Sequence, residues 1–165
     1  MRTNVVLVGL PAAGKSTLGV RLAKRLSLHF VDTDLLIQAR EGRRLQEILD
    51  DVGTAAFRRL EEEITLSLAS ERTLVATGGS VVYSVPSMEH LRTLGRVVYL
   101  HLTLAEWQRR LRDLDTRGVV RAPEQSLESL YAEREPLYRR WADRVVEVST
   151  LDPEEAVRQL ALAAS

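Results

Sequence analysis

The sequence predicts an α/β fold in which a five-stranded parallel sheet is flanked by helices on both faces. Five short apolar runs, rich in β-branched residues, alternate with longer amphipathic stretches. Buried parallel strands and their crossover helices give this alternation. The chain has 165 residues, with no internal repeat and no long linker. We therefore expect a single domain over residues 1–165.

The boundaries of the expected elements follow from local signals. Strands are predicted where β-branched runs end in Gly, Asp or another polar residue, and helices where apolar residues recur one turn apart. The strands are expected at 5–9, 29–32, 73–77, 96–102 and 144–148. The helices are expected at 15–26, 34–40, 44–51, 55–69, 86–94, 104–113, 125–142 and from 153 onward. Gly53 is expected to break the stretch between the third helix and the fourth.

Two further signals concern the region after the fourth strand. Thr103 and Glu106 have the spacing of a capping box, which opens the helix at 104. Residues 113–123 show no periodicity and are expected to form a loop.

The composition argues against several classes of function. Basic and acidic residues balance at 23 each, so no overall positive field attracts nucleic acid or an anionic membrane. The chain has no cysteine, and its three histidines lie far apart, which disfavours disulfides, thiol chemistry and a histidine metal site. The apolar run at the N-terminus is too short to span a membrane. We expect a monomeric, cytoplasmic protein that binds neither nucleic acid nor membrane.

The first expected strand runs into a phosphate-binding pattern. Residues 9–16 match G-x-x-x-x-G-K-[ST], between a strand and a helix. The N–H groups of such a loop surround phosphate oxygens, its lysine reaches the β- and γ-phosphates, and its serine ligates Mg²⁺. An ordinary Gly-rich turn would not require the whole pattern. The predicted nucleotide-binding residues are Gly9, Ala12, Ala13, Gly14, Lys15, Ser16 and Thr17.

Polar or small residues stand at the ends of the next two strands. We assign Asp32 to the metal and Asp34 to the substrate hydroxyl, whose proton a carboxylate can accept. The alternative is that one of them caps the following helix, and capping is compatible with catalysis. Gly78 and Gly79 follow the third strand and allow a ligand to approach the backbone closely.

The remaining signals narrow the class of nucleotide enzyme. The loop at 113–123 carries Arg117 and Arg121 and resembles a lid that closes over phosphates. The chain lacks both the guanine-reading N-K-x-D motif of GTPases and the Asp-Glu strand end of mechanical ATPases. These absences leave a small kinase that phosphorylates a hydroxyl or a phosphate group of a small molecule.

These motifs, in this order, resemble the shikimate kinase family, within the wider group of nucleoside monophosphate kinases. The resemblance covers nearly all of the chain. It rests on the P-loop, Asp32-x-Asp34, Phe57-Arg58 with Glu61, Gly78-Gly79, Arg117 and Arg134-x-Pro136-Leu137-Tyr138. It implies a P-loop kinase fold, a helical substrate-binding region at about 33–61 and a mobile lid at about 112–124. It also implies phosphorylation of the 3-hydroxyl of shikimate, in aromatic amino-acid biosynthesis, with ATP and Mg²⁺.

The resemblance assigns roles that spacing alone does not. It implies that Asp34 binds the ring hydroxyls, and that Arg58, Gly79 and Arg134 hold the carboxylate of the acceptor, with Gly78 beside them. It implies that Arg117 is catalytic and meets the nucleotide phosphates. It places the adenine near Arg110 and near residues 150–153. The expected partner is therefore a small alcohol that bears a carboxylate, for which a guanidinium is the natural ligand.

The sequence departs from the family pattern at three places. Ala12 and Ser80 stand where the family usually has glycine, and Gly118-Val119-Val120 replaces the usual Pro-Leu-Leu after the lid arginine. The last two departures touch the substrate and lid surfaces. They leave open a related kinase for another hydroxy acid, such as gluconate or a hydroxy-amino acid. A nucleotide-binding regulator without turnover is a further alternative, against which the intact P-loop and aspartates argue.

Overall fold

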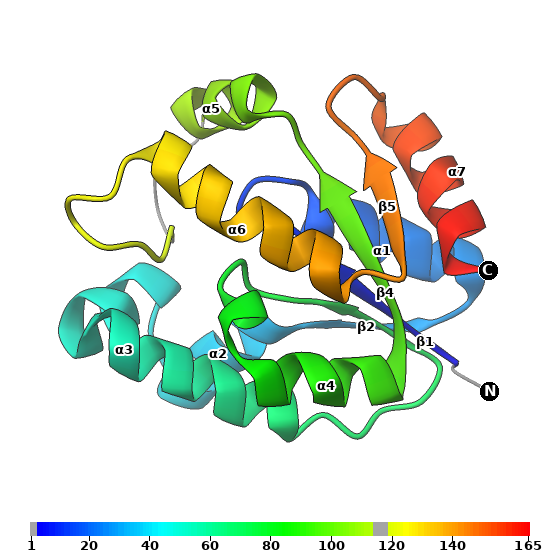
Figure 1. The fold of residues 1–165 in the computed structure, drawn as a ribbon. Coiled ribbons are helices and arrows are strands. Elements are labelled where there is room, and N and C mark those ends of the chain that lie inside the picture. The colour runs from blue at the N-terminus through cyan, green and yellow to red at the C-terminus, as the bar shows by residue number, and fades with distance from the viewer. Residues whose placement is uncertain (1–2, 114–118) are drawn as a thin grey trace.

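The computed structural model describes residues 3–113 and 119–165. In that part of the chain, five parallel strands form one sheet in the order β2-β3-β1-β4-β5, as predicted (Figure 1). The strands are β1 (Asn4–Val8), β2 (His29–Asp32), β3 (Thr73–Ala76), β4 (Gly95–His101) and β5 (Arg144–Glu147). Every strand lies within one residue of its predicted bounds at each end.

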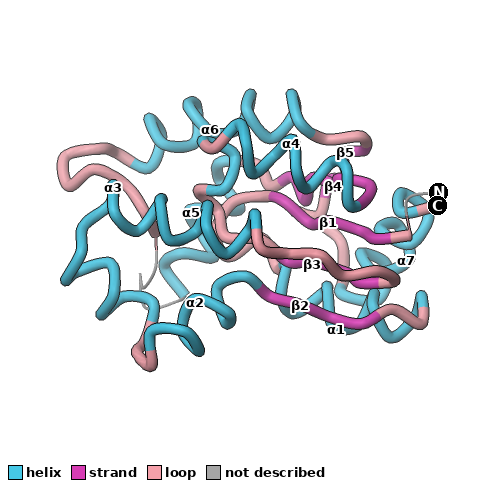
Figure 2. The backbone as a smooth tube through the Cα atoms, turned by 90° about the horizontal axis from the view of Figure 1, so that it is seen from below, coloured by secondary structure: helices cyan, strands magenta, loops and turns pink. Residues whose placement is uncertain are grey.

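Helices connect the strands and cover the sheet. They are α1 (Lys15–Leu26), α2 (Thr33–Glu41), α3 (Leu45–Leu66), α4 (Val85–Leu94), α5 (Leu104–Asp113), α6 (Leu127–Trp141) and α7 (Pro153–Ala164). A 3₁₀ turn, η1 (Val81–Tyr83), is the element that the sequence did not predict. Helices α1 and α7 lie on one face of the sheet, and α3, α4 and α6 lie on the other (Figures 1 and 2).

The strand order brings together the motifs that the sequence singled out. β1 lies at the centre of the sheet and is buried along its whole length, as its apolar sequence requires. Its neighbour β3 pairs Ala76 with Leu7 of β1 and with Asp32 of β2. The carboxyl ends of β1, β2 and β3 therefore meet at one edge, which is where ligands bind in open parallel sheets.

The region formed by α2 and α3 has a small apolar core of its own. Gly53 interrupts α3 with non-helical angles, φ 76° and ψ 169°, so the predicted break is present as a kink within one continuous helix. The second core consists of Ile37, Ile48, Phe57, Ile64 and Val120. Val120 lies in the segment between residue 118 and α6, and this segment passes close to α3 (Figure 1).

The predicted capping box at the start of α5 is half wrong. The Glu106 N–H donates to Thr103 Oγ1 at 3.3 Å, as expected. The Glu106 carboxylate, however, binds Arg109 and Arg110 instead of the Thr103 N–H, which donates to Ser149 Oγ at 2.9 Å. Hydrogen bonds from a guanidinium to a carboxylate are stronger than those from a neutral amide, which explains the choice.

The loop predicted at 113–123 is only partly described. Residues 119–123 are neither helix nor strand, while 114–118, with Arg117 and Gly118, lie outside the described residues. In the described part of the chain, no helix is both long enough and apolar enough to cross a membrane.

Candidate active site

A cleft opens above the loop between β1 and α1. Its lining combines the phosphate-binding pattern with the ends of β2 and β3: Pro11, Ala12, Gly14, Lys15, Ser16, Thr17, Asp34, Leu45, Thr77 and Gly79. Lys15 is buried, and its Nζ donates to the carbonyls of Gly9 at 2.7 Å and Leu10 at 2.8 Å. Burial lowers the pKa of Lys15 to about 8, although the charges of Asp34 and Asp32 act in the opposite direction.

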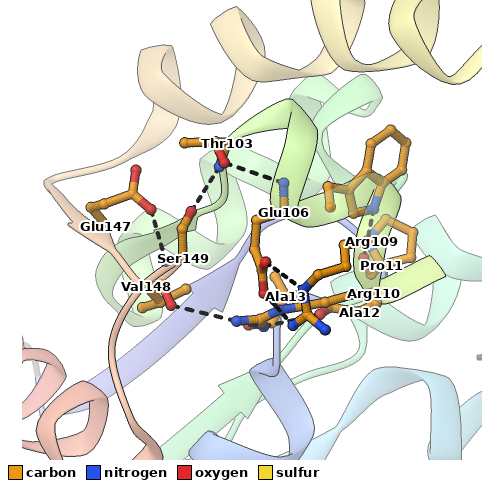
Figure 3. A network of polar contacts seen from close by, with 11 residues as sticks. Pro11, Ala12, Ala13, Thr103, Glu106, Arg109, Arg110, Glu147, Val148 and Ser149 are labelled. Atoms are coloured by element: carbon orange, nitrogen blue, oxygen red, sulfur yellow. Dashed lines mark hydrogen bonds and ion pairs between the residues drawn. The ribbon is translucent and has the colours of Figure 1, made fainter. Parts of the chain in front are cut away.

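Side chains of helix α5 bind the backbone of the P-loop (Figure 3). Trp107 is buried, and its Nε1 donates to the Pro11 carbonyl at 2.9 Å. Arg110 donates to the carbonyls of Ala12 and Ala13 at 3.3 and 3.4 Å and to the Val148 carbonyl at 3.4 Å. Arg110 thus lies between the P-loop and the end of β5, on the side where we expect the adenine.

Asp32 performs two tasks with its two carboxylate oxygens. One oxygen caps α2 by accepting the N–H groups of Asp34 at 2.9 Å and Leu35 at 3.4 Å. The other accepts the Ser16 hydroxyl at 2.5 Å. Asp32 therefore caps α2, and the same carboxylate also faces the P-loop serine.

Asp34 lies in the first turn of α2 and lines the cleft. Burial raises its pKa to about 6, the charge of Asp32 raises it further, and the charge of Lys15 opposes the rise. A Cβ atom on Gly78 would lie 2.9 Å from Asp34 Oδ1 and would overlap Glu61 Oε1. Glycine at this position thus makes room for two carboxylates at the end of β3.

Two arginines converge on the ring of Tyr83. The guanidinium carbons of Arg58, from α3, and Arg134, from α6, lie 4.0 and 5.3 Å from the ring centre. Arg134 is fully buried; its Nε donates to the Tyr83 hydroxyl at 3.3 Å, and its Nη2 donates to the Val120 carbonyl. Arg134 Nη1 and Arg58 Nε are buried and have no hydrogen-bond partner among the described residues.

Gly79 stands between this arginine pair and the P-loop. A Cβ atom on Gly79 would lie 3.1 Å from Arg134 Nη1 and 3.0 Å from Pro11 Cδ. The Gly79 carbonyl accepts the Tyr138 hydroxyl at 2.5 Å, which ties α6 to the end of β3. Arg134 therefore adjoins the P-loop cleft, whereas Arg58 lines a neighbouring cavity with Glu61, Ser80, Tyr83 and Ser87.

Three residues near the arginines received no role from the sequence. Glu61 is buried and accepts the Ser80 hydroxyl; burial raises its pKa to about 7, and that hydrogen bond opposes the rise. The sequence offered a signal for Glu61, namely its spacing from Arg58 in the family motif. Ser80 had one too, as a departure from the family pattern. Tyr83 had none, because it lies in η1, a turn without periodicity.

The comparisons with known proteins agree with this geometry. The family model for shikimate kinase matches residues 11–164. The shikimate kinase of Aromatoleum aromaticum is 42% identical over 159 residues, which cover 94% of this chain and 91% of that protein. That of Mycobacterium avium is 37% identical over 162 residues, which cover 97% and 92%.

Solved structures show the same relationship. The shikimate kinase from Acinetobacter baumannii in complex with shikimate superposes with a TM-score of 0.87 and 31% identity, covering 95% of this chain and 89% of that one. A gluconokinase from Sinorhizobium meliloti shares the fold, with a TM-score of 0.57 and 19% identity over 98% of this chain and 90% of its own. The P-loop, the aspartate pair and a family match over nearly all of its length together place this chain in the shikimate kinase family of ATP-using kinases.

Proposed function

We propose that this protein transfers the γ-phosphoryl group of ATP to the 3-hydroxyl of shikimate in the cleft between the P-loop, Asp34 and Gly79. The observation that carries the choice of acceptor is the pair of buried guanidinium nitrogens, Arg58 Nε and Arg134 Nη1, that have no hydrogen-bond partner in the described part of the chain. A buried guanidinium with free N–H groups is a strong site for a carboxylate, because it offers charge-assisted hydrogen bonds. The site thus provides for one anionic group besides the phosphates.

We assign the transfer step to Lys15 and Asp34. In the ligand-free protein, Lys15 Nζ donates to two loop carbonyls, and bound phosphate oxygens would replace them as its partners. Asp34, whose pKa is about 6, is ionised at neutral pH and accepts the proton of the attacking hydroxyl. Lys15 then stabilises the charge that develops on the transferred group.

The residues beside the P-loop suit a magnesium ion. Ser16 and Asp32 present a hydroxyl and a carboxylate next to each other, the oxygen donors that Mg²⁺ prefers. Among the described residues, no group of three carboxylates or histidines could bind a metal alone. Mg²⁺ would therefore arrive with the nucleotide phosphates, as is usual in such sites, and would neutralise their charge.

The remaining assignments concern the two substrates. Arg58 and Arg134 bind the acceptor carboxylate, and Gly78 and Gly79 allow the acceptor ring to approach the backbone. Residues 9–17 bind the phosphates, and Arg110 lies beside the adenine. Arg117 is assigned to the phosphates from the family resemblance alone. We expect the protein to act as a cytoplasmic monomer, which light scattering of the purified protein would check.

The test is ADP release in a coupled assay with shikimate, gluconate, a hydroxy-amino acid or no acceptor. We expect rapid turnover with shikimate and only the background rate with the others. Faster turnover with gluconate or the hydroxy-amino acid would identify a sibling kinase, the alternative that Ser80 and Val119-Val120 leave open. Background rates with every acceptor, together with tight ATP binding, would identify a regulator that has lost turnover.

A further inference from the structure

One short segment, residues 79–83, borders the arginine pair on several sides. Gly79 adjoins Arg134, Ser80 contacts Glu61, and Tyr83 underlies both guanidinium groups. Ser80 is 2% exposed, and its carbonyl accepts the Tyr83 N–H at 3.1 Å. The turn η1 therefore holds the Ser80 hydroxyl and the Tyr83 ring in a fixed relation.

Glu61 lies close to both arginines without forming an ion pair with either. Glu61 and Arg58 line the same cavity, and the charges of Arg134 and Arg58 oppose the rise that burial causes in the pKa of Glu61. Yet one Glu61 oxygen accepts from Ser80, and the other has no partner in the described part of the chain. Arg58 Nε and Arg134 Nη1 are likewise unpartnered there. The Glu61 carboxylate and the two guanidinium groups thus remain apart in one cluster, in which Glu61 and Arg134 are buried and Arg58 is half-buried.

The Ser80 hydroxyl accounts for this separation. It is the hydrogen-bond donor that holds the Glu61 carboxylate among the described residues, and it belongs to the segment that follows β3. We propose that Ser80 is a positioning residue for the acid group of the acceptor: it restrains Glu61, so that Arg58 and Arg134 stay open to an external carboxylate. The proposal rests on the function proposed above.

Removing the hydroxyl should let Glu61 compete with the substrate. In Ser80→Ala, the released carboxylate would turn toward the guanidinium nitrogens that now lack a partner. If this internal ion pair forms in about nine of ten molecules, the apparent affinity for the acceptor falls about tenfold, because only the open fraction binds. The nucleotide contacts do not involve Ser80 and should not change.

The experiment measures kcat and KM for shikimate and for ATP in a double-mutant cycle of Ser80→Ala and Glu61→Gln. We expect Ser80→Ala alone to raise the KM for shikimate about tenfold, with kcat and the KM for ATP within about twofold of wild type. In the Glu61→Gln background, the same substitution should change the KM for shikimate by less than about twofold, because a neutral amide forms no ion pair.

Two further variants guard against a purely structural effect. Ser87→Ala removes a buried hydroxyl from the same cavity. Within residues 3–113 and 119–165 this hydroxyl has no hydrogen-bond partner, so the KM of the variant for shikimate should match wild type. Ser80→Thr keeps a hydroxyl donor and should retain most of the wild-type affinity. Melting temperatures show whether each variant is folded. If Ser80→Ala does not fold, the KM of Ser80→Thr for shikimate tests the proposal instead.

The proposal is overturned if Ser80→Ala leaves the KM for shikimate unchanged, or raises the KM for shikimate and for ATP alike. It is also overturned if the defect persists at full size in the Glu61→Gln background, or if Ser80→Thr shows the same defect. These outcomes leave the proposed function intact, because that function is tested by turnover of shikimate in the wild-type protein.

Discussion

Replacing Glu61 with glutamine should stabilise the protein at neutral and alkaline pH and leave its stability unchanged in acid. The reason is the burial of this carboxylate, which is 3% exposed and whose pKa rises from 4.5 to about 7. Each pKa unit corresponds to about 1.4 kcal/mol. The ionised side chain therefore costs the folded state at most about 3.5 kcal/mol at pH 8, and Glu61→Gln removes that cost.

The pH dependence distinguishes this cause from a change in packing. Between pH 4.5 and 7, the unfolded chain ionises Glu61 while the folded protein keeps it protonated. The folded state then binds more protons, so the stability of the wild type falls as pH rises through this window. Below it both states are protonated, and above it both are ionised. The advantage of the variant should therefore grow from near zero at pH 4.5 to its full value above pH 7.

The assay is urea unfolding of both proteins at half-unit intervals between pH 4.5 and 8.5, with the difference in unfolding free energy plotted against pH. Other titrating groups contribute to both curves and largely cancel in the difference. A constant difference across the whole range would show that the ionisation of Glu61 is not the cause, as would a variant less stable than wild type at pH 8.

Four other predictions concern the site. Lys15→Met should lower kcat by a factor of about 100 or more without lowering the melting temperature, since its charge serves the transition state and is penalised by burial; residual activity above about a tenth would contradict this role. Asp34→Asn should lower kcat much more than ATP affinity, and the wild-type rate should fall below about pH 6, where Asp34 becomes protonated; an acid limb that survives the substitution would assign it to another group. Arg58→Lys should lower kcat/KM for shikimate roughly ten- to a hundredfold and spare ATP binding, because an ammonium cannot replace a stacked guanidinium; equal losses for both substrates would remove Arg58 from the acid site. Ala12→Gly should raise the unfolding free energy in urea by about 0.5 kcal/mol, since Ala12 has a φ of 64°; a loss of stability would show that this conformation carries no strain.

The parts of the fold that local sequence signals determine were predictable. Helix α1 begins and ends where the P-loop and its leucine spacing indicate, and β2 coincides with its prediction. Both segments are bounded by residues whose conformational preferences are strong, such as Gly14 and Asp32. The kink at Gly53 belongs to the same class, because only glycine adopts its φ of 76° and ψ of 169° at low cost.

The arrangement of the acid site was not predictable from spacing. Arg58 and Arg134 come from different helices and meet at Tyr83, a residue in a turn with no periodic pattern. The chain has many arginines, and tertiary packing alone determines which two of them meet in the acid site. The half-formed capping box has the same origin in part: the Thr103 N–H donates to Ser149 Oγ, a contact between segments far apart in the chain.

The hydrogen bond from Trp107 to the P-loop gives the protein an internal optical reporter. The emission of an indole depends on the polarity and hydrogen bonding around its N–H group, and here that group is joined to the Pro11 carbonyl at 2.9 Å. The chain contains two tryptophans, and the other, Trp141, lies at the far end of α6. A Trp141→Phe protein would therefore emit from beside the phosphate loop alone, and nucleotide titrations could be followed without a label.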